Sequence, residues 1–135
     1  MSVTETISVI QNDLENLRCD KTQQFPVAAA EGDYVRQGDV YITLRSQIPS
    51  DCSESDHGLQ LAPGTTKGSR HLLDSGEGVT FYVRQEPTVL QGPFLRLDCE
   101  RVLKHPEHGD WKLPPGLYEI TYQRVHADEL RRVLD

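Results

Sequence analysis

Apolar and polar side chains alternate along this chain with a period of two, which is the period of a β-strand. Four segments show it, with apolar positions at Val40, Ile42 and Leu44, at Val79, Phe81 and Val83, at Leu95, Leu97 and Cys99, and at Tyr118, Ile120 and Tyr122. Glycine and proline residues separate the segments, and both residue types favour turns. Strands without helices between them indicate antiparallel pairing, so we predict a mainly β fold, either an antiparallel β-barrel or a sandwich.

A different period occurs near the N-terminus. Apolar residues recur there at intervals of three and four, which predicts an amphipathic helix from about 4 to 18, and these residues are Ile7, Ile10, Leu14 and Leu17. The C-terminal segment ADELRRVLD predicts a short second helix. We therefore expect an N-terminal helix over residues 1–20 and a single all-β domain over residues 21–135. The apolar stripe of the first helix also suggests a possible homodimer formed through it.

Charge and cysteine content limit the classes of partner. The chain has 14 Lys and Arg against 21 Asp and Glu, a net charge of -7, which disfavours nucleic acids and anionic membrane surfaces as partners. Its three cysteines form no C-x-x-C pair, and no apolar run approaches the roughly 18 residues of a membrane span. We expect a soluble cytoplasmic protein without a signal peptide.

The segment PGTTKGSRH combines glycines, hydroxyls and two cations, a composition that can bind an anion through backbone N–H groups. Lys67, Gly68 and Arg70 are its candidate ligand-binding residues, although an ordinary flexible hairpin explains the same composition. Trp111 is a further candidate, because a tryptophan beside histidines can line a small-molecule pocket; the alternative is a packing residue. Cys52 lies beside Asp51, which disfavours its thiolate, so a cysteine nucleophile is not predicted here.

Two histidines, His105 and His108, precede a Pro-Pro-Gly corner. Together with another histidine or a nearby carboxylate they could supply the three or four ligands of a zinc site. However, Pro106 prevents a regular helix here, so the one-face geometry that makes H-E-x-x-H diagnostic is not available. The other interpretation is a connection between two strands, with both histidines at its solvated rim.

The chain resembles a family of small, largely uncharacterised bacterial proteins of unknown function. The resemblance covers residues from about 37 to 135 and is carried by Gln37-Gly38-Asp39-Val40, Gly68-Ser69-Arg70-His71, His105-Pro106-Glu107-His108, Leu113-Pro114-Pro115-Gly116-Leu117-Tyr118, Gln123-Arg124 and Arg131-Arg132-Val133-Leu134-Asp135. The family's middle motif usually has a histidine where this chain has Ser69, which counts against a complete metal or catalytic site. The resemblance implies no established activity, but it does suggest that His71, His105 and His108 form one cluster.

Two hypotheses follow from these observations. The first, which we favour, is a non-enzymatic binding or accessory module that presents its loops to an unidentified protein or small molecule. The second is a metal-dependent hydrolase, in which His71, His105 and His108 bind the metal and Glu107 acts as a general base toward a metal-bound water. The sequence identifies no cofactor for either.

Overall fold

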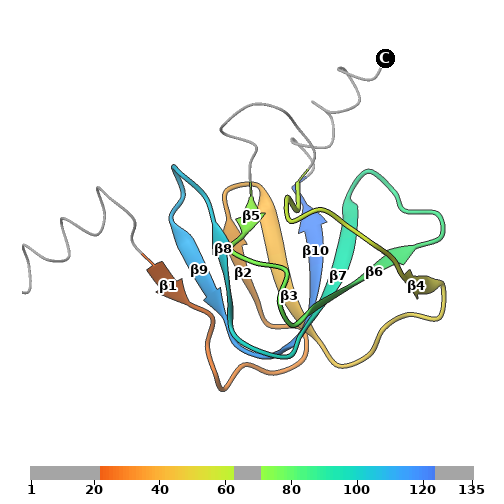
Figure 1. Ribbon diagram of the computed structural model, residues 1–135, viewed down its shortest axis with the longest axis horizontal. Coiled ribbons are helices and arrows are strands. Elements are labelled where there is room, and N and C mark those ends of the chain that lie inside the picture. The colour runs from red at the N-terminus through yellow and green to blue at the C-terminus, as the bar shows by residue number, and fades with distance from the viewer. Residues whose placement is uncertain (1–21, 63–70, 124–135) are drawn as a thin grey trace, which may run out of the picture.

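The fold is described from a computed structural model, which covers residues 22–62 and 71–123 (Figure 1). Both predicted helices lie outside these residues, as do Lys67, Gly68 and Arg70. The described residues form strands and no helix. In chain order the strands are β1 (Thr22–Gln24), β2 (Tyr34–Gln37), β3 (Val40–Arg45), β4 (Cys52–Glu54), β5 (Leu72–Leu73), β6 (Val79–Arg84), β7 (Gln91–Leu97), β8 (Arg101–Lys104), β9 (Asp110–Leu113) and β10 (Gly116–Tyr122).

The larger sheet has six strands in the order β2-β3-β10-β7-β6-β4, and every neighbouring pair in it is antiparallel. The four alternating segments of the sequence form β3, β6, β7 and β10, which confirms the predicted strands, except that β7 ends at Leu97 and Cys99 lies beyond it. Their register places Ile42 opposite Ile120, and Leu95 opposite both Tyr118 and Phe81. Because side chains alternate between the two faces of a sheet, this register directs the apolar set to the same face.

The smaller sheet has four strands in the order β1-β9-β8-β5. Strands β8 and β9 form a hairpin, and β5 adds to β8 in the antiparallel direction. Strand β1 instead pairs with β9 in parallel, with Gln23 opposite Trp111. A parallel pair needs a long connection, and here the chain between β1 and β9 includes most of the larger sheet.

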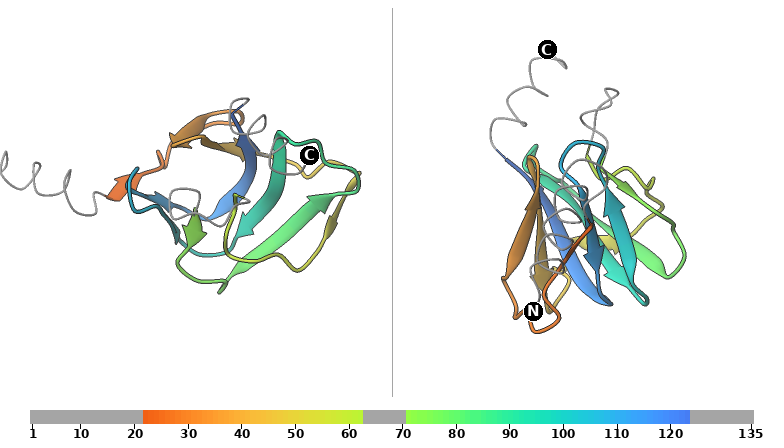
Figure 2. Two further views of the ribbon diagram at one scale, coloured as in Figure 1. Left: turned by 90° about the horizontal axis from the view of Figure 1, so that it is seen from above. Right: turned by 90° about the vertical axis from the view of Figure 1, so that its left-hand side faces the viewer.

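One hydrophobic core lies between the two sheets, which face each other across it (Figure 2). It joins residues of the larger sheet such as Ile42 and Ile120 to Leu103 and Leu113 of the smaller sheet, all fully buried. Within the described residues no strand of one sheet pairs with a strand of the other, so the β-barrel alternative is wrong. No helix in this part of the chain is long and apolar enough to cross a membrane.

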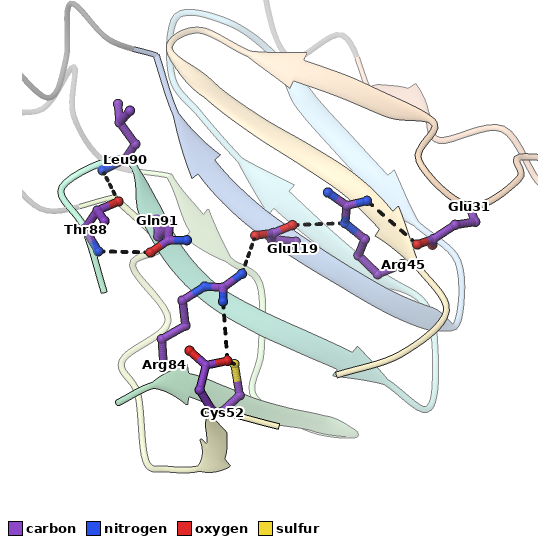
Figure 3. Close-up of polar contacts among 9 residues, drawn as sticks. Glu31, Arg45, Cys52, Arg84, Thr88, Leu90, Gln91 and Glu119 are labelled. Carbon is purple, nitrogen blue, oxygen red and sulfur yellow. Dashed lines mark hydrogen bonds and ion pairs between the residues drawn. The ribbon is translucent and has the colours of Figure 1, made fainter. Parts of the chain in front are cut away.

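The outer face of the larger sheet contains a row of charged side chains (Figure 3). Glu119 on β10 accepts a hydrogen bond from Arg45 Nε on β3 at 2.9 Å and pairs with Arg84 Nη2 on β6 at 3.2 Å. Arg84 reaches across β7, where its guanidinium carbon lies 5.2 Å from the centroid of the Phe94 ring. Glu119 is only 7% exposed, so the two cations compensate a carboxylate that is largely removed from water.

Candidate functional site

The predicted histidines meet around the side chain of Gln37, which is fully buried at the end of β2. Its Nε2 donates one hydrogen bond to the carbonyl of Leu103 at 2.9 Å and another to the carbonyl of Gly109 at 2.7 Å. Leu103 belongs to β8 and Gly109 precedes β9, so this amide connects the two sheets. We call the surrounding group the polar joint, and it consists of Gln37, Gly38, Asp39, His71, His105 and His108.

The amide of Gln37 determines which ring nitrogen of His71 carries a proton. Two carbonyls accept from Nε2, so the atom that faces His71 Nδ1 at 2.8 Å is the acceptor Oε1. Nδ1 of His71 therefore carries a proton. The other ring nitrogen, Nε2, lies 3.5 Å from Asp39 Oδ1. His71 is fully buried, with the Gln37 amide bound to one of its ring nitrogens and the Asp39 carboxylate facing the other.

His105 caps the turn between β8 and β9. Its Nδ1 accepts hydrogen bonds from the backbone N–H groups of Glu107 and His108, both at 3.1 Å. Nδ1 therefore carries no proton, and it has the role that an asparagine or aspartate oxygen has at a helix N-cap. His105 is 2% exposed, so its predicted place at a solvated rim is wrong, whereas His108 is exposed as expected.

The three imidazoles lie in a row, and adjacent rings are tilted by 44° and 35°. The ring centroids of His71 and His105 are 4.4 Å apart, and those of His105 and His108 are 4.5 Å apart. A metal ligand must direct an unprotonated nitrogen at the ion, but Nδ1 of His105 already accepts two hydrogen bonds, so in the neutral ring its other nitrogen carries the proton. Across residues 22–62 and 71–123, no group of three or more His, Cys, Asp or Glu side chains could hold a metal ion. The geometry therefore does not favour the predicted metal centre, and the role of Glu107 beside it is left without support.

Gly38 occupies the turn between β2 and β3 with a φ of 60°, in the left-handed region that glycine tolerates best. A Cβ atom at this position would lie 2.6 Å from Cδ2 of His108. The glycine therefore satisfies two requirements, because it permits the turn and leaves space for the imidazole of His108.

Trp111 lies on β9 and packs against the hydrophobic core, which agrees with the packing interpretation. Cys52 is partly buried at the start of β4, and burial, followed by the charge of Asp51, raises the pKa of its thiol. This direction agrees with the expectation that Cys52 is a poor nucleophile.

A pocket of about 310 Å³ lies next to the polar joint. Its apolar lining consists of Leu61, Ala62, Val83, Pro87, Gly92 and Pro93, and its polar lining of His57, Gln60, Gln91 and Tyr122. Leu61 connects the pocket to the joint, because its N–H donates to the carbonyl of His71 at 2.8 Å, and its own carbonyl accepts from the Tyr122 hydroxyl at 2.6 Å. Sequence analysis missed this pocket, since its lining comes from segments far apart in the chain.

The fold and the site together define a small, mainly β domain with two sheets, a polar joint between them and the pocket beside Leu61. The chain belongs to the family described as a domain of unknown function (DUF8820), whose model matches residues 36–123. The matched range includes every residue of the polar joint and the entire lining of the pocket. Comparison with curated proteins finds no match, and neither does comparison with solved structures.

Proposed function

We propose that this domain is a non-enzymatic binding module and that its ligand is a small molecule bound in the pocket beside Leu61. The observation that carries the proposal is the pocket itself. Its volume of about 310 Å³ is at the lower end of the range for small-molecule sites, and its lining is mostly apolar with a few polar side chains. Lysine, arginine, aspartate and glutamate are absent from its described lining.

The polar joint supports this proposal as a structural element. Gln37 connects the larger sheet to the β8–β9 hairpin, and the backbone of His71 connects the joint to Leu61 in the pocket lining. Such contacts fix the relative positions of segments that are distant in the sequence. A pocket formed in advance binds with a smaller ordering cost than one that must assemble around its ligand.

The metal-dependent hydrolase gains no supporting observation from the site, so we do not propose it. Contact of Lys67, Gly68 and Arg70 with a ligand remains a prediction, and so does a homodimer through the N-terminal helix.

A screen of small fragments by protein-observed NMR tests the proposal. We expect binding fragments to shift the backbone signals of Leu61, Gln91 and Tyr122, and to lose affinity for a Val83→Phe variant, because the larger ring would occupy part of the pocket. Tyr82→Phe is the matched control, since Tyr82 is the neighbouring residue of β6 and does not line the pocket. Fragments that bind Val83→Phe as tightly as the wild type, or that shift only distant signals, would contradict the proposal.

A further inference from the structure

The lining of the pocket restricts the charge of its ligand. This inference rests on the proposed function, because it concerns the same pocket. The apolar part includes Leu61 and Ala62, each only 1% exposed, and no Lys, Arg, Asp or Glu lines the described part of the pocket. An ion transferred to such a site without a partner loses its hydration at a cost of several kcal/mol. The described part of the lining is therefore best suited to an uncharged molecule with a largely apolar body.

His57 lines the pocket with an imidazole whose orientation is restricted by two contacts. Its Nδ1 lies 2.7 Å from the carbonyl of Gly58, and since a carbonyl can only accept, Nδ1 is the protonated nitrogen. In the neutral ring Nε2 then has a lone pair, on the edge of the ring away from Gly58. The ring also stacks on Phe81, with a centroid distance of 5.1 Å and an interplanar angle of 28°. These two contacts orient the imidazole before any ligand binds.

Gln91 supplies the opposite hydrogen-bonding group. Its Oε1 accepts from the backbone N–H of Thr88 at 3.0 Å, which leaves the NH₂ end of the amide as the donor. Pro87 and Pro93 add rigid apolar surface to the same pocket. The lining therefore includes an acceptor at His57, a donor at Gln91 and flat apolar surface, and a hydroxyl attached to a ring is complementary to this combination because it both donates and accepts.

We propose that the ligand is a small uncharged ring compound of the phenol class, whose hydroxyl donates to Nε2 of His57 and accepts from the amide of Gln91, while its ring lies against the apolar lining. Phenol itself is a suitable probe, and anisole is its matched control because a methyl ether has no proton to donate.

Titration of isotope-labelled protein with each probe, followed by NMR, tests the proposal. We expect phenol to shift the signals of His57, Leu61 and Tyr122 and to bind about five- to tenfold more tightly than anisole, which is the effect of one neutral hydrogen bond. The His57→Phe variant keeps an aromatic ring against Phe81 but removes the acceptor, so the two probes should then bind with equal affinity. The His108→Phe variant, altered at an exposed histidine of the polar joint, should retain the preference for phenol.

Equal affinities of phenol and anisole in the wild type would overturn the assignment of His57, and the pocket would still stand as a binding site if both probes shifted its signals. Phenol that shifts no signal of the pocket would overturn the inference entirely. The fragment screen with Val83→Phe decides the proposed function separately, because it does not depend on the class of the ligand.

Discussion

Gln37 and His71 form one buried hydrogen-bonded unit, in which Oε1 of the amide lies 2.8 Å from Nδ1 of the imidazole and both side chains are fully buried. The amide also donates to two carbonyl groups of the smaller sheet. The two carbonyls take the two protons of the NH₂ group, and His71 donates to the oxygen. Only one orientation of the amide satisfies all three hydrogen bonds. A substitution that preserves the shape of the side chain but removes its hydrogen-bond donors should therefore lower the stability of the folded protein.

Gln37→Glu makes such a change. The carboxylate would place an oxygen where Nε2 now faces the carbonyls of Leu103 and Gly109, so two donors are lost and a buried charge is added. We expect the free energy of unfolding to fall by about 3 kcal/mol or more, as measured by urea denaturation at neutral pH. Gln37→Met, which removes the hydrogen bonds without adding charge, should cost less. A Gln37→Glu protein as stable as the wild type would show that the amide does not have the orientation described.

The sequence predicted the strands better than the site, and the reason is the range of the interactions. Alternation around Ile42 or Ile120 is local, so it identified strands and their buried faces. Two features depend instead on contacts between segments that are distant in the sequence, so no local pattern encodes them. These are the parallel pairing of β1 with β9 and the absence of strand pairing between the two sheets within the described residues. The resemblance grouped the histidines correctly, but their donor roles depend on Gln37, whose side chain had no predicted function.

His105→Asn tests the capping role of His105. The asparagine Oδ1 can accept from the N–H groups of Glu107 and His108 in place of Nδ1, whereas alanine cannot. We expect His105→Ala to be less stable than His105→Asn by about 1 kcal/mol, the usual contribution of a cap. Both variants lose the ring that packs beside His71, so their difference isolates the cap. Equal thermal stability of the two variants would contradict this role for Nδ1.

Gly38→Ala, made in the wild type and in a His108→Ala background, separates the cost of backbone strain from the cost of steric conflict with His108. A Cβ at this position adds the cost of a positive φ, about 1–2 kcal/mol, to a contact of 2.6 Å with Cδ2 of His108. We expect the substitution to lower the free energy of unfolding by more in the wild type than in a His108→Ala background, where only the backbone cost is left. A double-mutant cycle measures the difference. Identical effects in both backgrounds would mean that His108 moves away without cost.

Glu119→Gln tests the charged row on the outer face. The substitution keeps the size of the side chain but leaves Arg45 and Arg84 beside a neutral amide. We expect a loss of about 1–2 kcal/mol, since the carboxylate is mostly buried while both cations are partly exposed. Asp51→Asn is the control, because Asp51 is exposed and pairs with Arg84 at 3.5 Å, and its loss should be smaller than about 1 kcal/mol. A larger loss of stability from Asp51→Asn than from Glu119→Gln would contradict the view that Glu119, which pairs with both arginines, contributes most to the row.

Stability at high pH should depend on two buried tyrosines. Burial raises the pKa of both Tyr118 and Tyr122 from 10.0 to about 12, with a further contribution from Asp39 at Tyr122. Between pH 10 and about 12 the unfolded chain therefore releases these protons first, while the folded protein still binds them. The free energy of unfolding should be unaffected by these groups below pH 10 and should fall as the pH rises through this window.

The loss should amount to no more than about 3 kcal/mol for each tyrosine. Urea denaturation across a pH series measures it, and phenolate absorbance of the folded protein should show two tyrosines that ionise late. Tyr122→Phe removes one of them, together with the hydrogen bond to Leu61, so this variant should be less stable at neutral pH and less sensitive to alkali. A wild-type stability that stays constant from pH 10 to 12 would show that these hydroxyls ionise as easily in the folded protein as in the unfolded chain.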